Sequence, residues 1–257
     1  MLKNKKGIIF GIANDHSIAW GIAKKMHENG AKLAITYQNE ILLKRVKPLA
    51  KQVDADLLLE CDFDKNNSLE AVIDQVKKEW GELDFVVHAV AYSDKNQLNG
   101  RYIETSKDNF IRSLSISCFS FTKIARLVQP IMKRGGSLLT LSFYGSVKVM
   151  PNYNVMGVAK AALETSVKYL SVDLGENNIR VNAISAGPMR TLAGAAIANA
   201  REVYKYTEEN SSLKRNVNLH ELGNTSVYFV SDLSQAVTGE IHYVDCGFNI
   251  KGMPKNY

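Results

Sequence analysis

Short apolar runs alternate with helix-like segments along the whole chain, and this alternation constrains the fold more than any single motif. The runs are apolar at consecutive positions, as in strands that helices cover on both faces of a sheet, and they occupy residues 7–12, 31–37, 56–61, 83–90, 136–143, 180–185 and 240–245. Between them, apolar residues recur at helical spacing, which predicts helices at 18–29, 40–53, 68–80, 106–133, 152–175 and 220–231. This order predicts an α/β fold: a Rossmann-like, doubly wound, seven-stranded parallel sheet with helices on both faces.

No feature divides the chain into separate units. The 257 residues contain no Pro/Gly/Ser-rich linker, internal repeat or low-complexity tract, so we predict a single domain over 1–257. Residues 188–217 depart from the alternation, because they are alanine-rich and only weakly apolar. A long excursion after a strand is typical of a helical lid over a substrate; a pair of ordinary surface helices is the alternative.

Composition argues against several classes of protein. No apolar run approaches the ~18 residues that span a bilayer, and the short apolar stretch after the basic N-terminus lacks a signal-peptide cleavage site. We therefore expect a cytoplasmic protein with no membrane partner. The three cysteines are far apart and the five histidines lack the spacing of metal ligands, so we expect neither a disulfide framework nor a bound metal.

The chain is basic, with a formal net charge of +6. A solvated surface rich in lysine accounts for this charge, and so does an acidic partner, either a phosphate-bearing ligand or an acidic protein. The basic residues are scattered and form no nucleic-acid motif, so we expect no nucleic-acid partner.

The turn after the first predicted strand has the composition of a nucleotide phosphate site. A pyrophosphate needs backbone N–H groups, close approach of the backbone and the positive end of a helix dipole. Gly11 permits a tight turn, Ala13 keeps the backbone accessible, and Ser17 can cap the next helix and donate to a phosphate. The pattern is not G-x-G-x-x-G, and an ordinary strand–helix turn is the alternative, although the position after strand one favours a nucleotide.

Residues at the ends of the next strands suit the adenosine half of a dinucleotide. Gln38 is neutral, so it can hydrogen-bond a ribose but offers no positive charge to a 2′-phosphate, which favours NADH over NADPH. Asp62 could accept from the adenine amino group while Phe63 packs on the ring; a simple turn role for Asp62 is the alternative. Small residues within 88–93 would let the cofactor ribose pass close to the backbone.

A tyrosine and a lysine follow the fifth strand. Tyr153 and Lys160 are seven residues apart, so on one helix they would differ by only about 20° around the axis and point into one cleft. A nearby ammonium would lower the pKa of the tyrosine and could hold a cofactor ribose, although any amphipathic helix gives such a pair by chance. The helix 152–175 is apolar almost all round, which predicts burial on two sides. One side must be the sheet, and the other could be a second subunit.

In these segments the chain resembles the short-chain dehydrogenase/reductase superfamily, and within it the bacterial NADH-dependent enoyl-[acyl-carrier-protein] reductases. The matching segments cover nearly the whole chain in order: GIANDHSIAWGIA (11–23), TYQNE (36–40), CDF (61–63), PNYNVMGVAKAALE (151–164), IRVNAISAGPMRTLA (179–193) and VTGEIHYVDCGF (237–248). The six residues between Tyr153 and Lys160 are the most specific feature, because most of the superfamily has three.

The resemblance implies an activity: hydride transfer from NADH to the β-carbon of a trans-2-enoyl thioester, the last reductive step of type II fatty-acid elongation. Tyr153 would stabilise the enolate oxygen, Lys160 would bind the nicotinamide ribose, and the substrate would lie near Ser93, Phe143 and Tyr153. The resemblance also implies cofactor contacts at Gly11, Ala13, Ser17, Ile18, Gln38, Asp62, Phe63, Val90, Lys160, Met189, Arg190, Thr191, Leu192 and Ala193. Similar enzymes are homotetramers that act on an acidic carrier protein, which fits the two-sided helix and the basic charge.

One position departs from the family pattern. The family usually has another active-site tyrosine ten residues before Tyr153, where this chain has Phe143. Neighbouring strand residues face opposite sides, so Tyr144 would not replace the missing hydroxyl unless the strand end twists. Because the enolate contact is assigned to Tyr153, we expect the reaction to survive.

Two other functions remain open at this point. The chain could be a related reductase that acts on a ketone or an enoyl-CoA. It could also be a nucleotide-binding regulator that kept the fold and lost catalysis, a hypothesis that only the missing hydroxyl at position 143 supports.

Overall fold

Seven strands form one parallel sheet in the computed structural model, which describes residues 1–195, 197 and 199–253. Their order is β3-β2-β1-β4-β5-β6-β7, with β1 Lys6–Phe10, β2 Lys32–Tyr37, β3 Leu57–Glu60, β4 Phe85–His88, β5 Gly136–Phe143, β6 Ile179–Ala186 and β7 Ile241–Val244. All neighbouring pairs are parallel, which confirms the predicted doubly wound sheet. The strand order reverses between β1 and β4, where folds of this kind bind ligands.

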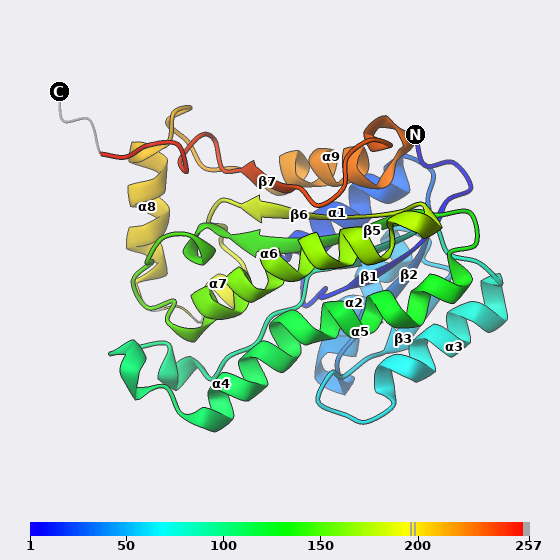
Figure 1. The fold of residues 1–257 in the computed structure, drawn as a ribbon, viewed down its shortest axis with the longest axis horizontal. Coiled ribbons are helices and arrows are strands. Elements are labelled where there is room, and N and C mark those ends of the chain that lie inside the picture. The colour runs from blue at the N-terminus through cyan, green and yellow to red at the C-terminus, as the bar shows by residue number, and fades with distance from the viewer. Residues whose placement is uncertain (196, 198, 254–257) are drawn as a thin grey trace.

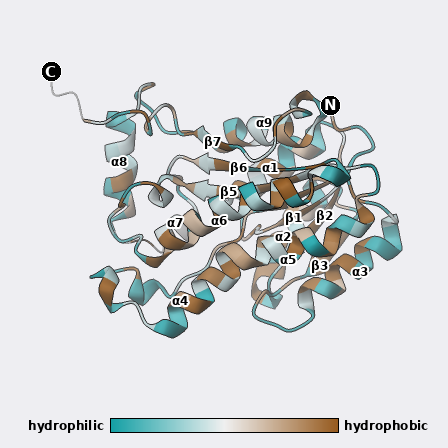
Figure 2. Ribbon diagram, in the orientation of Figure 1, coloured by the Kyte–Doolittle hydropathy of each residue, from teal (hydrophilic) through white to brown (hydrophobic). Residues whose placement is uncertain are grey.

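Helices cover both faces of the sheet (Figure 1). They are α1 Ile18–Glu28, α2 Glu40–Gln52, α3 Ser68–Trp80, α4 Lys107–Leu114, α5 Ser120–Val128, α6 Val155–Asp173, α7 Leu192–Ala195, α8 Ala200–Asn210 and α9 Leu219–Val230. Helices α1, α2 and α9 share one apolar core, which includes Leu139 and Phe229. Helices α3, α5 and α6 share the core on the other face, which includes Phe121 and Leu138. Figure 2 shows hydrophilic residues, in teal, on the connecting loops and also on helices such as α3 and α8.

Two predicted helices differ from the observed ones. The segment predicted as 106–133 consists of α4, a π-helical turn Ser115–Phe119, α5 and a 3₁₀ turn; π turns are rare and are not visible as a hydrophobic period.

The segment predicted as 152–175 becomes helical only at Val155, because Asn152 and Asn154 have φ values of +58° and +40°. Backbone with positive φ is unfavourable for most residues, and asparagine tolerates it better than most. Tyr153 therefore lies in a turn before α6, and the helical-surface argument for its pairing with Lys160 was wrong.

The segment 188–217 lies beyond the carboxyl ends of β5 and β6, where Figure 1 shows α7 and α8. Residues 196 and 198 of this predicted lid are outside the described residues. None of the helices in the described ranges is long and apolar enough to cross a membrane.

Candidate active site

The turn after β1 requires glycine at its first position. Gly11 has a φ of +103°, and a Cβ at this residue would lie 2.1 Å from the carbonyl oxygen of Ala89, just after β4. Any side chain would push these two strand ends apart. Gly11 therefore lets the backbone of the turn run close to the point where the strand order reverses.

Ser17 stands at the N-cap position of α1, as predicted, but its side chain does not cap the helix. Its hydroxyl instead accepts hydrogen bonds from the backbone N–H groups of Ala13, at 3.0 Å, and Asn14, at 3.1 Å. The first N–H groups of an α-helix have no partner within the helix, and the first turn of α1, which begins at Ile18, contains no acidic residue. The positive end of α1 is thus available to an anion such as a pyrophosphate.

Gln38 and Asp62 meet at the carboxyl ends of β2 and β3. The Gln38 amide lies 3.4 Å from Asp62 Oδ1, and the same oxygen accepts the backbone N–H of Asp64 at 3.1 Å. Asp62 therefore also has the turn role that the sequence left open. Phe63 packs against Phe10, with ring centroids 5.8 Å apart.

The segment after β4 is anchored to the core and to α4. Val90 is partly buried and packs against the core between the sheet and α3, α5 and α6. Ser93 is partly exposed and hydrogen-bonded to the side chain of Asn109. The two predicted site residues therefore lie on one short segment at the carboxyl edge of the sheet.

Tyr153 is buried beyond the end of β5, with 8% of its surface exposed. Its ring stands edge-on to Phe143, with centroids 5.0 Å apart and planes at 69°. Burial, and then the negative charge of Glu164, raise the pKa of the Tyr153 hydroxyl well above its ordinary value. At neutral pH this hydroxyl is protonated and can donate a hydrogen bond.

Two glycines, neither of which was identified as a site residue from the sequence, make this position of Tyr153 possible. A Cβ on Gly145 would lie 2.4 Å from Cδ1 of Tyr153, and a Cβ on Gly157 would lie 2.7 Å from the carbonyl oxygen of Gly145. The start of α6 thus packs directly on the 3₁₀ turn Tyr144–Ser146. An isolated glycine inside a helical pattern, as at position 157, was the signal of a close contact.

Lys160 lies on α6 with only 6% of its surface exposed. Its ammonium donates to the carbonyl oxygen of Leu141 at 2.7 Å. Burial lowers the pKa of Lys160 to about 8, while Cys118 and Glu164 act in the opposite direction. The side chain therefore reaches β5 near its carboxyl end.

Tyr144 does not supply the hydroxyl that is missing at position 143. This agrees with the prediction from the alternation of strand side chains. Its hydroxyl donates to the carbonyl oxygen of Asn249 at 3.4 Å, and its ring packs against Tyr243 and Phe248 at centroid distances of 6.5 and 5.6 Å. Phe143 contacts Tyr153 instead. The rings of Phe143 and Tyr144 therefore pack in different places, the first against Tyr153 and the second against Tyr243 and Phe248.

The predicted cofactor segment after β6 leads into α7. Met189 is partly buried, and the guanidinium of Arg190 lies over the ring of Tyr204 at 4.6 Å. Thr191 Oγ1 accepts the backbone N–H of Gly194 at 2.9 Å. Leu192 is half exposed, and Ala193 belongs to α7 by its backbone, while its side chain is outside the described residues.

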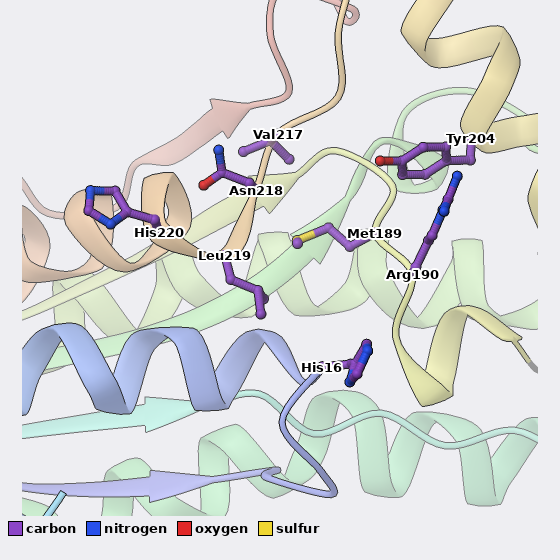
Figure 3. Close-up of a pocket in the computed structure, with 8 residues that line it drawn as sticks. All are labelled: His16, Met189, Arg190, Tyr204, Val217, Asn218, Leu219 and His220. Carbon is purple, nitrogen blue, oxygen red and sulfur yellow. The ribbon is translucent and has the colours of Figure 1, made fainter. Parts of the chain in front are cut away.

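A cavity of about 420 Å³ lies between this segment and the starts of α1 and α9 (Figure 3). Figure 3 shows Met189 and Arg190 on one side, His16 below them, and His220 with Leu219 on α9. Tyr153 and Lys160 are not among the described residues that line this cavity. The cavity adjoins the phosphate end of the candidate site, and neither His16 nor His220 was identified from the sequence as a lining residue.

The strand order, the glycine turn before α1 and the buried tyrosine and lysine beyond β5 define an α/β nucleotide-dependent oxidoreductase. A family model described as enoyl-(acyl carrier protein) reductase matches residues 11–249, and the chain belongs to this family.

Proteins and structures similar to the chain carry the same description. Enoyl-[acyl-carrier-protein] reductase [NADH] 2 of Rhizobium meliloti (strain 1021) is 58% identical over 254 residues, which are 99% of this chain and 95% of that protein. The crystal structure of FabI from Candidatus Liberibacter asiaticus has a TM-score of 0.97 and 55% identity, over 99% of this chain and 98% of that one. The Anaplasma phagocytophilum reductase, solved in complex with NAD, has a TM-score of 0.96 and 52% identity, over 99% and 97% of the two chains.

Proposed function

We propose that the protein is an NADH-dependent enoyl-[acyl-carrier-protein] reductase that reduces the carbon–carbon double bond of a trans-2-enoyl thioester. The observation that carries the proposal is the protonated, buried Tyr153 beside the end of β5, with Lys160 buried on the adjoining helix. The names of its close relatives support the same activity. The reaction would complete each round of type II fatty-acid elongation.

The cofactor site fits a dinucleotide. Gly11 leaves room that a Cβ would fill, and the start of α1 offers backbone N–H groups next to Ser17 and Ile18. Gln38 and Asp62 would hold the adenosine half. When bound, NADH supplies the hydride. The remaining cofactor residues of this proposal are Ala13, Phe63, Val90, Lys160 and Met189 through Ala193.

NADH rather than NADPH follows from the charges around Gln38. Its side chain is uncharged and hydrogen-bonded to Asp62, so a 2′-phosphate would face a nearby carboxylate and gain no direct cationic partner. Lys44 and Arg45, on α2, are exposed. We expect the ratio kcat/KM to be much higher with NADH than with NADPH.

Tyr153 and Lys160 would share the chemical step. The Tyr153 hydroxyl would donate to the substrate carbonyl oxygen, which becomes an enolate oxygen as hydride reaches the β-carbon. Lys160 would hold the nicotinamide ribose by hydrogen bonds. Ser93 and Phe143 would line the substrate side, and α7 and α8 would act as the lid within 188–217.

The proposal extends to partners and location. The +6 net charge favours an acidic carrier protein. A homotetramer is supported by large apolar side chains that stay exposed near α5 and on α6, namely Phe119, Tyr169 and Val172. A cytoplasmic location remains a prediction.

An absorbance assay tests the proposal. NADH consumption is followed with an enoyl thioester of acyl carrier protein, with an enoyl-CoA and with a simple ketone. We expect turnover with the thioesters, and Tyr153→Phe should lower kcat by about 10²–10³-fold without changing the circular dichroism spectrum. Turnover of the ketone alone would make the chain a different reductase, and turnover unaffected by Tyr153→Phe would remove the tyrosine from the mechanism.

A further inference from the structure

Glu164 is a buried carboxylate one helical turn after Lys160. Only 9% of its surface is exposed, and its Oε1 accepts hydrogen bonds from the hydroxyls of Ser142 and Ser146, both at 2.5 Å. An oxygen that accepts two hydroxyl donors suits the ionised form of a carboxylate. A buried negative charge therefore lies on α6 one turn beyond Lys160, and the proposed reaction assigns no role to it.

The structure fixes Lys160 and Glu164 on the same side of α6. Residues four apart on a helix are neighbours, and both side chains are tied to consecutive residues of β5. Lys160 donates to the carbonyl oxygen of Leu141, and Glu164 accepts from the hydroxyl of Ser142. Because both groups are buried, their charges interact with little screening by solvent.

Other ionisable groups also face Lys160, and Cys118 comes before Glu164 among those that raise its pKa. His88, on β4, is fully buried, and burial lowers its pKa to about 3, so it is neutral near pH 7. Cys118, in the π-helical turn, shares a contact of 3.4 Å with the hydroxyl of Ser166. Around Glu164 lie Tyr153 and, on β7, Tyr243, and burial followed by the Glu164 charge raises both phenol pKa values.

Glu164 also anchors the surface on which Tyr153 rests. Ser142 and Ser146 stand on either side of Gly145, and a Cβ on Gly145 would overlap the Tyr153 ring. Two hydrogen bonds to one carboxylate oxygen therefore hold the segment 142–146 in place. A movement of this segment would change the orientation of the tyrosine.

We propose that Glu164 is a positioning residue for the reduction, whose buried charge keeps Lys160 cationic and whose hydrogen bonds fix the segment that orients Tyr153. This inference rests on the proposed function, because it assigns Glu164 an effect through the two residues placed there. It separates two contributions of one side chain, charge and anchoring, that different substitutions can remove.

Two variants of Glu164 separate these contributions, with Glu176→Gln, at an exposed position, as the control. Glu164→Gln keeps the size of the side chain and one accepting oxygen but removes the charge. Glu164→Asp keeps the charge and shortens the reach toward the serines. The measurements are kcat/KM with an enoyl thioester and the Kd of NADH alone, each between pH 6 and pH 9.5.

The expected results differ between the variants. In the natural enzyme kcat/KM should fall, and the Kd of NADH should rise, as Lys160 loses its proton near pH 8. Glu164→Gln should move both changes about one pH unit lower. Its kcat/KM should therefore be about tenfold below that of the natural enzyme at pH 8.5 and only slightly below it at pH 6. Glu164→Asp should leave both changes near pH 8 and should lower kcat by a similar factor at every pH. Glu176→Gln should match the natural enzyme.

Other outcomes would overturn the inference without touching the proposed function. A Glu164→Gln enzyme that is weaker by one constant factor across the pH range would show a structural role only. A profile that coincides with that of the natural enzyme would show no role at all. Should Glu164→Gln fail to fold, the Asp variant still decides, because a fall displaced from pH 8 in that variant contradicts the assignment of charge. Failure of the proposed function would appear separately, as absent NADH consumption by the natural enzyme.

Discussion

The two faces of the sheet use their buried positions differently. On the face covered by α1, α2 and α9, the core is filled by aliphatic and aromatic side chains such as Leu139 and Phe229. The face covered by α3, α5 and α6 has a similar apolar core, but toward the carboxyl ends of β4 and β5 it buries His88, Lys160 and Glu164. Burial of apolar surface stabilises a fold, whereas burial of ionisable groups costs free energy and shifts their pKa values. The face covered by α1, α2 and α9 therefore mainly stabilises the fold. The face covered by α3, α5 and α6 also buries ionisable groups, at a cost in stability, near the candidate site.

The largest effect should come from the apolar face. Phe229→Ala removes a ring that is 1% exposed and should lower the free energy of unfolding by about 3–5 kcal/mol. Urea unfolding measures this loss, and Tyr228→Ala, at the half-exposed neighbouring position, is the control with a smaller effect. The kcat of the folded fraction should stay near that of the natural enzyme; a large loss of kcat would break the contrast between the faces.

The next effect should appear in activity rather than stability. Gly145→Ala places a methyl group 2.4 Å from the Tyr153 ring, so the ring must shift, and kcat should fall about 10²-fold. Gly175→Ala is the matched control, because nothing lies within 4 Å of a Cβ there. If Gly145→Ala kept full activity, the ring position of Tyr153 would not matter for the reaction.

His88, on the face covered by α3, α5 and α6, should make the free energy of unfolding depend on pH. Its pKa is about 3 in the folded protein and about 6.5 in an unfolded chain, so its contribution is complete above pH 6.5 and is lost as the pH falls toward 3. Between pH 7.5 and pH 5 this amounts to about 2 kcal/mol of unfolding free energy. The pH dependence should be reduced by that amount in His88→Gln and unchanged in His220→Gln, an exposed histidine. Equal pH dependence in all three proteins would remove His88 as its source.

Phe143→Tyr should have the smallest effect. Restoring the hydroxyl usual in the family should change kcat/KM by less than about tenfold, which corresponds to less than about 1.4 kcal/mol. The reason is that the donor to the enolate is assigned to Tyr153, against whose ring Phe143 packs. A gain of several orders of magnitude in the enoyl thioester assay would show instead that the natural enzyme is impaired at this position.

Part of the candidate site was predictable because it is local in sequence. Gly11 was identified from its place after a strand, and its positive φ and contact with Ala89 agree with that prediction. Tyr144 was correctly separated from Phe143 by the alternation of strand side chains. The contacts of Glu164 with Ser142 and Ser146 could not be predicted, because they join residues 22 and 18 positions apart.

By itself the sequence determined the seven strands, most of the helices and the family, because apolar periodicity and motif spacing are properties of the chain. Only the tertiary structure decided where the tyrosine and the lysine lie. Lys160 projects from α6, but Tyr153 stands in a turn between two asparagines with positive φ, and its ring packs against Gly145 where Gly145 meets Gly157. The same packing buries Lys160 and Glu164 and so shifts the pKa of the lysine. Desolvation of a charge depends on everything that surrounds it, and a linear sequence does not specify those neighbours.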